Sequence, residues 1–361
     1  RKDIQHLTFA YTFTYNFLTF FIGPTELYGQ CGTGGPDHSY WGRPEEYDRP
    51  HPCYKIDASK PGSDLAGETS ASLSAASIAF KNVDPDYSTI LLKHAKELYE
   101  FAKNYQATYT GGIPDAAGFY NSFSGYKDEL AWSAAWLFKA TGESTYLQDA
   151  EGFYNEMQQN AGEFSWDNKG RGVSVLLSNL ISGENKYFSN AKDFCENVLP
   201  SKPKTPRGTV FIQKWGSNRH AGNVAFLCLV YGKINDDKSS ANVYKVKAFG
   251  RDQINTMLGD ENKGERSYVV GYGFNYPKQP HHRSSSCPTT GSCGWPQKDA
   301  DGPNPQILYG ALVGGAKDAQ GDYTDKRGDY IANEVAIDYN AGFQSALAGL
   351  LSMQSNGECG K

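Results

Sequence analysis

The chain has 361 residues, of which 39% are hydrophobic and 21% charged, and its formal net charge is −5. This length allows one large domain or two domains and is enough to bury a substantial core. The basic residues are scattered, so no Lys/Arg run indicates binding to nucleic acid or to an anionic membrane. Aromatic residues make up 14% of the chain. Tyr and Trp rings suit carbohydrate surfaces, but packing within the core explains most such residues equally well.

Residues 7–22 carry no charge. From Phe9 to Phe17 aromatic side chains alternate with polar residues or Ala, which is the period of a strand. The segment is too short and too rich in Thr for a transmembrane span, and it has neither an initiating Met nor a clear signal-peptide cleavage site. We therefore separate an anomalous aromatic-rich segment, residues 1–22, from a single domain, residues 23–361.

From residue 65 onward the pattern is helical and repeated. Residues 65–80 are rich in Ala and Ser, as in a tightly packed helix. In residues 87–104 one helical face collects apolar side chains, namely Ile90, Leu91, Ala95, Leu98 and Ala102. Further helices are expected near residues 127–140, 145–159, 171–180, 185–198, 219–232, 240–258 and 330–353.

Long loops are expected at residues 31–64, 106–126, 199–218 and 259–305, and loops of this length are usually functional. No strand-rich region interrupts the helices, so the predicted class is all-α. Many antiparallel helices with long loops favour an α/α barrel or an array of helical hairpins.

The chain contains seven Cys residues at spacings that fit no zinc template. Cys287 and Cys293 lie close together in a Ser/Pro/Gly-rich loop, which favours a local disulfide. Cys31 and Cys53 bracket another loop and are a second candidate pair. Cys195 and Cys228 lie in helical patterns and are expected to be buried thiols. These features favour a secreted, extracellular protein.

Glu334 is the most informative single residue. Its segment, Asp329 to Gly342, reads DYIANEVAIDYNAG and crowds acids, Tyr and Asn into what otherwise resembles the start of a buried helix. Sites that move protons on a sugar hold a carboxylic acid in such surroundings.

Two other segments carry candidate sugar-binding side chains. His281, His282 and Arg283 follow one another in a loop and can donate hydrogen bonds to sugar hydroxyls, although a polar surface loop is an equal alternative. Near the start, the segment LYGQCGTGGPDHSYWG places His38 and Trp41 beside an acid, a weak signal by itself.

The stretch FYNSFSGYKDEL brings Ser124, Gly125, Asp128 and Glu129 within six residues. Two carboxylates with hydroxyl and carbonyl oxygens are hard ligands that suit Ca²⁺. A helix capped by Ser124, with acids in its first turn, explains the same residues as well.

Several of these segments resemble glycoside hydrolase family 9. The two longest are SYVVGYGFNYPKQPHHRSSSCP and DYIANEVAIDYNAGF, and the order of five further segments also matches: LYGQCGTGGPDHSYWG, YKIDASKPGSDLAGETSA, FYNSFSGYKDELAW, FSWDNK and KWGSNRHAGN. The resemblance runs from about Pro24 to Leu350. Within the family, the sequence is most similar to the animal endoglucanases. It implies an all-α (α/α)6 barrel with an open cleft that binds β-1,4-glucan. It also implies hydrolysis of internal bonds with inversion, by a general acid and a base-activated water.

The resemblance assigns roles residue by residue. Glu334 matches the general acid, and Tyr339 matches a tyrosine close to the catalytic centre. The implied substrate-binding residues are His38, Trp41, Tyr120, Trp215, His281 and Arg283. Position 123 is Phe where many members carry Trp, so that stacking surface is smaller here. A structural Ca²⁺, with no cofactor for catalysis, is implied at Ser124, Gly125, Asp128, Glu129 and Asp167.

The family's base lies in an Asp-Ala-Gly-Asp motif that this sequence lacks. Asp115-Ala116-Ala117-Gly118 and Asp299-Ala300-Asp301-Gly302 are similar but occupy the wrong part of the pattern. We expect the chain to begin after the first helices of the barrel. Three explanations stay open: the sequence is an incomplete record of an active enzyme, the protein is an inactive glucan-binding or structural relative, or a second chain supplies the missing part.

Overall fold

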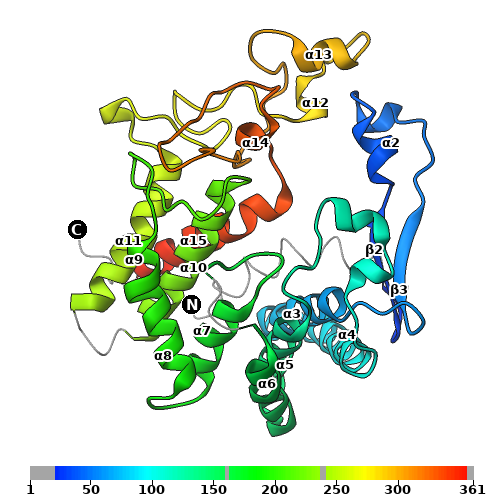
Figure 1. Cartoon of the computed structure of the whole chain (residues 1–361), viewed down its shortest axis with the longest axis vertical. Coiled ribbons are helices and arrows are strands. Elements are labelled where there is room, and N and C mark those ends of the chain that lie inside the picture. The colour runs from blue at the N-terminus through cyan, green and yellow to red at the C-terminus, as the bar shows by residue number, and fades with distance from the viewer. Residues whose placement is uncertain (1–20, 159–161, 236–240, 356–361) are drawn as a thin grey trace. The chain divides into compact units, whose positions relative to one another are not determined.

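The computed structural model describes residues 21–158, 162–235 and 241–355. They form two compact units (Figure 1). The first unit contains Gly34 and the described residues before it, together with His51–Phe194. The second unit contains Gly35–Pro50, together with Cys195 and the described residues after it. The aromatic segment of residues 7–22 falls almost entirely outside the described residues.

A small antiparallel sheet belongs to the first unit, in the order β1 (Phe21–Gly23), β2 (Glu26–Cys31) and β3 (Cys53–Asp57). Residues 53–57 were predicted to be loop, and this prediction was wrong. Leu27 of β2 lies opposite Ile56 of β3, and both side chains are fully buried. Burial of this apolar pair, which is too far apart in sequence to form a local pattern, stabilises the strand pairing.

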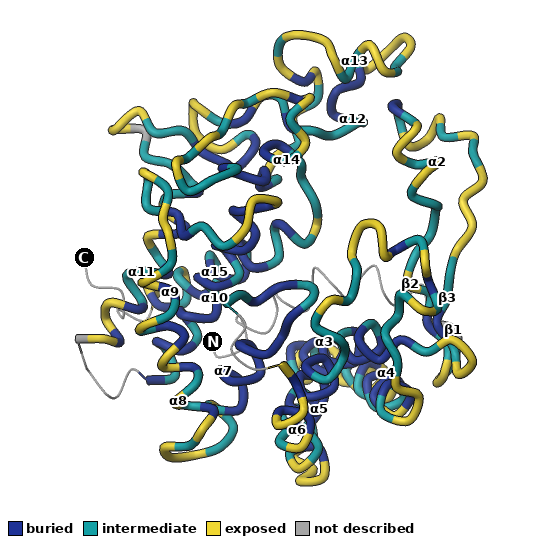
Figure 2. The backbone as a smooth tube through the Cα atoms, viewed as in Figure 1, coloured by how far each residue is buried: buried dark blue, intermediate teal, exposed yellow. Residues whose placement is uncertain are grey.

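Helix α3 (Ser63–Phe80) packs against both α4 (Pro85–Asn104) and α5 (Lys127–Thr141). Fourteen of its 18 residues are buried, and Figure 2 shows it as dark blue over most of its length. Its Ala and Ser side chains permit close approach on several sides. Ser70 donates a hydrogen bond to the carbonyl of Ala95 in α4 and accepts one from Ser133 in α5, each at 2.7 Å.

Helix α4 begins at an Asp84 cap that accepts a hydrogen bond from the backbone N–H of Tyr87. Leu91, Ala95, Leu98 and Ala102 are buried, as the sequence pattern predicts. Ile90 is 48% exposed, so its assignment to this face was wrong. Ile90 lies about 100° around the helix from Leu91, which turns it away from α3 and α5.

The remaining elements of the first unit are α6 (Ser144–Glu156), which packs on α5, the mutually packed pair α7 (Gly170–Leu180) and α8 (Lys186–Asp193), and the 3₁₀ turns η2 (Tyr109–Gly111) and η3 (Pro114–Gly118).

In the second unit, α10 (Ser217–Ile234), α11 (Ala241–Leu258) and α15 (Ile337–Ser355) pack on one another. The shorter described elements are α2 (Gly34–His38), η1 (Pro44–Glu46), the π-helical turn η4 (Phe194–Val198), α9 (Leu199–Ser201), η6 (Glu261–Lys263), α12 (Arg283–Ser286), α13 (Trp295–Asp299) and α14 (Tyr330–Asn333).

The helix predicted over residues 330–353 is broken in two. Helix α14 ends at Asn333, and α15 begins only at Ile337. Between them Glu334 is extended, with φ −58° and ψ 145°, and Val335 pairs with Val313. The backbone N–H of Gly314 donates to the carbonyl of Glu334 at 2.9 Å. At Glu334, pairing with the distant segment of Val313 and Gly314 therefore replaces the local helical hydrogen bonds.

Three disulfides are present among the described residues. Cys31–Cys53 and Cys287–Cys293 confirm the predicted pairs. Cys195–Cys228 is a third bond, so the prediction of two buried thiols was wrong. The π-helical turn holds Cys195 5.6 Å, Cα to Cα, from Cys228 of α10, and helical periodicity alone does not reveal which helices face each other.

No described helix is long and apolar enough to span a membrane.

Candidate active site

The carboxylate of Glu334 is held by two donors from different parts of the second unit. Trp215 donates from Nε1 to Oε2 at 2.6 Å, and the hydroxyl of Tyr339 donates to the same oxygen at 2.8 Å. Trp215 precedes α10, and Tyr339 lies in the first turn of α15. The break between α14 and α15 thus places Glu334, half-buried, where both can reach it.

Tyr339 is only 1% exposed and is fixed on several sides. The guanidinium of Arg219 lies 4.9 Å from its ring centroid and forms an ion pair with Asp338 at 2.6 Å. Burial and the neighbouring Glu334 raise the pKa of Tyr339, so its phenol keeps its proton and acts as a donor. Gly216 lets the Tyr339 ring approach closely: it has φ +66°, and a Cβ at this position would lie 3.0 Å from Cζ of Tyr339.

Two exposed rings accompany the acid. Trp215 is 44% exposed, and its ring centroid lies 5.4 Å from that of Tyr330, which is 48% exposed. Tyr330 was not among the site residues predicted from the sequence. Its position four residues before Glu334 was the available signal, because one helical turn places such residues on the same side.

His281 is tied to the Glu334 segment through the backbone. Its N–H donates to the carbonyl of Asn333 at 2.8 Å. Its ring Nδ1 lies 2.7 Å from the carbonyl oxygen of Arg327, so in the neutral form Nδ1 carries the hydrogen and Nε2 is an acceptor. Burial lowers the pKa of His281 and favours this neutral form.

Trp41 does not offer an exposed ring. It is 6% exposed, with its ring centroid 5.1 Å from that of His281 and 5.9 Å from that of Trp295. Its Nε1 donates to the hydroxyl of Ser286 at 2.9 Å. The structure thus places this predicted sugar-binding residue behind His281, where it supports the imidazole. Trp295 was not among the site residues predicted from the sequence, and it is 46% exposed.

Arg283 and the predicted cleft residue His38 meet at Asp37. Arg283 donates from Nη2 to both carboxylate oxygens of Asp37, at 2.9 and 3.2 Å, and from Nη1 to its carbonyl. His38 lies 3.8 Å from the same carboxylate, and its side chain is 66% exposed. Arg283 is therefore positioned by this acid, while the imidazole of His38 faces outward.

Tyr120 belongs to the first unit. It is 39% exposed and contacts Trp166 edge to face, with ring centroids 5.2 Å apart. Phe123, 75% exposed, also lies beside Trp166 at 6.2 Å. The structure thus brings Tyr120 and Phe123 together around Trp166 as an aromatic group.

The residues predicted to bind calcium lie in the first unit, where Asp128 and Glu129 are buried beside the buried Lys169. Asp167 accepts hydrogen bonds from the backbone N–H groups of Phe123 and Ser124, and Asp128 accepts one from Lys169. Burial raises the pKa of Glu129 well above its usual value, against the attraction of Lys169, and its buried Oε2 has no hydrogen-bond partner in the described structure. No group of three or more His, Cys, Asp or Glu side chains suited to a metal ion occurs within residues 21–158, 162–235 and 241–355. Ca²⁺ here would need carbonyl and hydroxyl oxygens as well, as the predicted set provides.

Comparisons with known proteins place these motifs in a family. The family model of glycosyl hydrolase family 9 matches residues 3–347. Endoglucanase B of Cellulomonas fimi is 42% identical over 341 residues, which is 91% of this chain and 32% of that protein. This chain spans 45–54% of the length of three further endoglucanases that it matches.

Solved structures agree with the family match. An endoglucanase from the termite Nasutitermes takasagoensis is 42% identical, with a TM-score of 0.89 over 98% of this chain and 85% of that chain. Endoglucanase CelQ of Clostridium thermocellum, crystallised with cellobiose and cellotriose, is 30% identical, with a TM-score of 0.83 over 98% of this chain and 61% of that chain.

Fold and site together define a mostly helical protein of the (α/α)6 barrel class with a carboxylic acid held among aromatic rings. The chain belongs to glycosyl hydrolase family 9. The predicted family and fold class are thereby confirmed.

Proposed function

We propose that this chain forms the catalytic part of an endo-β-1,4-glucanase, in which Glu334 is the general acid. The observation that carries the proposal is the convergence of Trp215 and Tyr339 on a single oxygen of Glu334, at 2.6 and 2.8 Å. The relatives that carry the name endoglucanase, and the related structures that contain cellobiose or cellotriose, support a β-1,4-glucan as the substrate.

The two hydrogen bonds define where the acidic proton resides. Oε2 accepts from both Trp215 and Tyr339, so a protonated Glu334 carries its hydrogen on Oε1. Oε1 then delivers the proton to the glycosidic oxygen as the bond to the leaving sugar breaks. His281, with Nε2 as an acceptor, and the exposed rings of Trp215 and Tyr330 bind the sugar units around that bond.

Inversion also requires a second carboxylate, which removes a proton from the attacking water on the opposite side of the sugar. Binding and hydrolysis must therefore be measured separately. Intact mass can show that a preparation contains this chain alone. If such a preparation hydrolyses soluble cellulose, the alternative that the protein is an inactive glucan-binding or structural relative is excluded. An inactive chain that gains activity only with a co-purifying second chain would assign the base to that partner.

The role of Glu334 is tested by Glu334→Gln, which keeps the shape of the side chain and removes its acidic proton. We expect turnover of soluble cellulose to be lost, while binding of cellotetraose by calorimetry changes little. Substantial hydrolysis by this variant would refute the assignment. Glu265→Gln, an acid of the same unit outside the site, is the matched control and should retain full activity.

We also propose a structural Ca²⁺ at Ser124, Gly125, Asp128, Glu129 and Asp167. The unpartnered buried Oε2 of Glu129 supports a cation at this place. Added Ca²⁺ at 100 times its Kd should stabilise the fold by about 2.7 kcal/mol, and a chelator should reverse this gain. Asp167→Ala should abolish the response. An unfolding temperature that is the same in Ca²⁺ and in chelator would overturn the proposal.

Secretion is part of the same proposal, supported by the three disulfides, because such bonds persist mainly in oxidising compartments. The protein should therefore be recovered from the medium with the six cysteines of these bonds oxidised. Recovery only from the reducing interior of the cell would contradict secretion.

A further inference from the structure

Trp295 is an exposed ring that has no role in the function proposed above. All six Trp residues of the chain are described, and only Trp215 and Trp295 are strongly exposed, at 44% and 46%. Trp215 contacts the acid Glu334 directly. Trp295 belongs to the short helix α13, which follows the Cys287–Cys293 disulfide loop.

A continuous row of rings joins the two tryptophans. Its successive members are Trp215, Tyr330, His281, Trp41 and Trp295, with centroid distances of 5.4, 6.0, 5.1 and 5.9 Å. Trp41 is the buried member, and Trp295 lies against it at a tilt of 37°. The row therefore begins at the acid and ends in a half-exposed indole.

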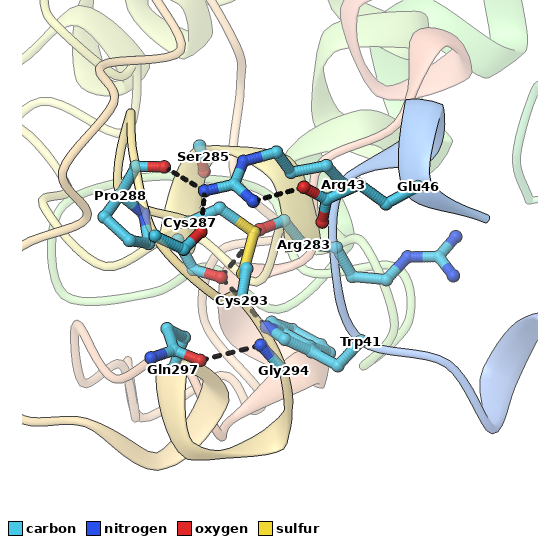
Figure 3. The surroundings of a disulfide bond; sticks show 12 residues. Trp41, Arg43, Glu46, Arg283, Ser285, Cys287, Pro288, Cys293, Gly294 and Gln297 are labelled. Atoms are coloured by element: carbon cyan, nitrogen blue, oxygen red, sulfur yellow. Dashed lines mark hydrogen bonds and ion pairs between the residues drawn. A yellow bond between two sulfur atoms is a disulfide. The ribbon is translucent and has the colours of Figure 1, made fainter.

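The chain fixes the position of Trp295 from both ends of its helix. Ahead of α13, the Cys287–Cys293 disulfide closes the loop, and Arg43 donates from Nη2 to the carbonyls of Pro288 and Gly291 at 2.6 and 3.0 Å (Figure 3). At the helix start, Gly294 donates from its N–H to Oε1 of Gln297 at 2.7 Å. A short surface helix held in this way presents its first side chain in a fixed orientation.

The far end of α13 is tied to the site itself. Arg327 donates from Nη1 to the carbonyls of Gln297 and Ala300, both at 2.7 Å. The carbonyl of Arg327 in turn accepts the hydrogen bond from His281 Nδ1 at 2.7 Å. One buried arginine therefore connects the helix that carries Trp295 to the imidazole beside Glu334.

We propose that Trp295 is a stacking surface for a glucose unit remote from the cleaved bond, and that it makes the site prefer longer β-1,4-glucans. This inference rests on the proposed function, because it needs a glucan bound beside Glu334. A rigid aromatic ring binds the apolar face of a sugar without an ordering cost of its own. Since His281 and Trp41 lie between Glu334 and Trp295 in the row of rings, we expect cellobiose bound at the acid not to reach Trp295.

The test compares cellobiose with cellohexaose, by calorimetry, in a Glu334→Gln background that prevents turnover. Adding Trp295→Ala should weaken cellohexaose binding about 10-fold, as expected for loss of one aromatic stacking contact, and leave cellobiose unchanged. Trp295→Phe keeps a ring and should restore most of the affinity. Tyr244→Ala, which removes a 63% exposed ring from α11, is the matched control and should change neither affinity.

Kinetics on the active protein give a second measurement. Trp295→Ala should raise KM for cellohexaose and leave kcat unchanged, because the contact lies away from the reacting atoms. If the variant binds both sugars as its parent does, Trp295 is only a packing partner of Trp41 and the inference is overturned. If the parent itself binds neither sugar, the proposed glucanase function is refuted. That outcome differs from one in which the parent binds both sugars without a preference for the longer one, which refutes only the role of Trp295.

Discussion

The indole Nε1 of Trp215 donates a hydrogen bond to Oε2 of Glu334 at 2.6 Å, although 119 positions separate the two residues in the sequence. The bond fixes which carboxylate oxygen is occupied and which is available to a substrate. It also joins the segment before α10 to the break between α14 and α15, so two distant parts of the chain must fold correctly before the acid is oriented.

Trp215→Phe removes this hydrogen bond and keeps an aromatic ring. A hydrogen bond to a charged group contributes about 1.5–3 kcal/mol, so kcat on soluble cellulose should fall roughly 10- to 100-fold. Tyr339→Phe should act in the same direction. Because both donors serve one oxygen, the double variant should lose less than the product of the single losses, which a double-mutant cycle measures. Strictly independent effects would contradict a shared role.

Gly216→Ala should disturb Tyr339 through a clash rather than through lost chemistry. Gly216 has φ +66°, and an added Cβ would lie 3.0 Å from Cζ of Tyr339. We expect a loss of about 1–3 kcal/mol in the free energy of unfolding, together with a lower kcat. Gly264→Ala is the control, because Gly264 has φ +68° and nothing within 4 Å of an added Cβ. It should lose stability from backbone strain while keeping full kcat.

His281 should make the folded state sensitive to acid. Burial lowers the pKa of His281 below its ordinary value of 6.5, against the opposing influences of the hydrogen bond to the Arg327 carbonyl and of the Glu334 carboxylate. Below pH 6.5 the unfolded chain therefore binds more protons at this residue than the folded protein does. The stabilisation that follows is complete above pH 6.5 and is lost as the pH falls through the folded pKa.

The measurement is the free energy of unfolding between pH 5 and 8 for the wild type and His281→Gln. The variant should lose less stability on acidification than the wild type. Burial also lowers the pKa of His282, and His281 lowers it further, so removing His281 weakens the acid sensitivity of His282 as well and acts in the same direction. An imidazole that titrates above pH 6.5 in the folded protein would show that the predicted direction is wrong.

The Cys287–Cys293 disulfide should matter for binding more than for global stability. The two residues are six apart, and closing so short a loop contributes only about 2–2.5 kcal/mol to the free energy of unfolding. We expect Cys287→Ser/Cys293→Ser to weaken cellohexaose binding as Trp295→Ala does. Cys31→Ser/Cys53→Ser, which opens a longer loop in the first unit, should cost more stability and leave that length preference intact. If loss of Cys287–Cys293 left cellohexaose binding unchanged, the disulfide would have no part in positioning Trp295.

Several features were predictable because their signals are local. The helices predicted at residues 65–80 and 87–104 follow from the Ala- and Ser-rich composition of the first and the apolar periodicity of the second. The Cys287–Cys293 pair follows from its short spacing. Strand β3 and the Cys195–Cys228 bond were missed because each depends on a partner distant in sequence, Leu27 opposite Ile56 in one case and Cys228 bonded to Cys195 in the other.

By itself, the sequence determined the helical class and the family and singled out Glu334 as the candidate acid, because these depend on residue order and on motifs that lie within short segments. Tertiary structure alone decided how that acid is held. Pairing of Val335 with Val313 interrupts a helix that local propensity favours, and it turns Glu334 toward Trp215 and Tyr339. Tertiary packing also buried Trp41 and left Trp295 exposed, since the burial of a ring depends on which distant segments pack over it.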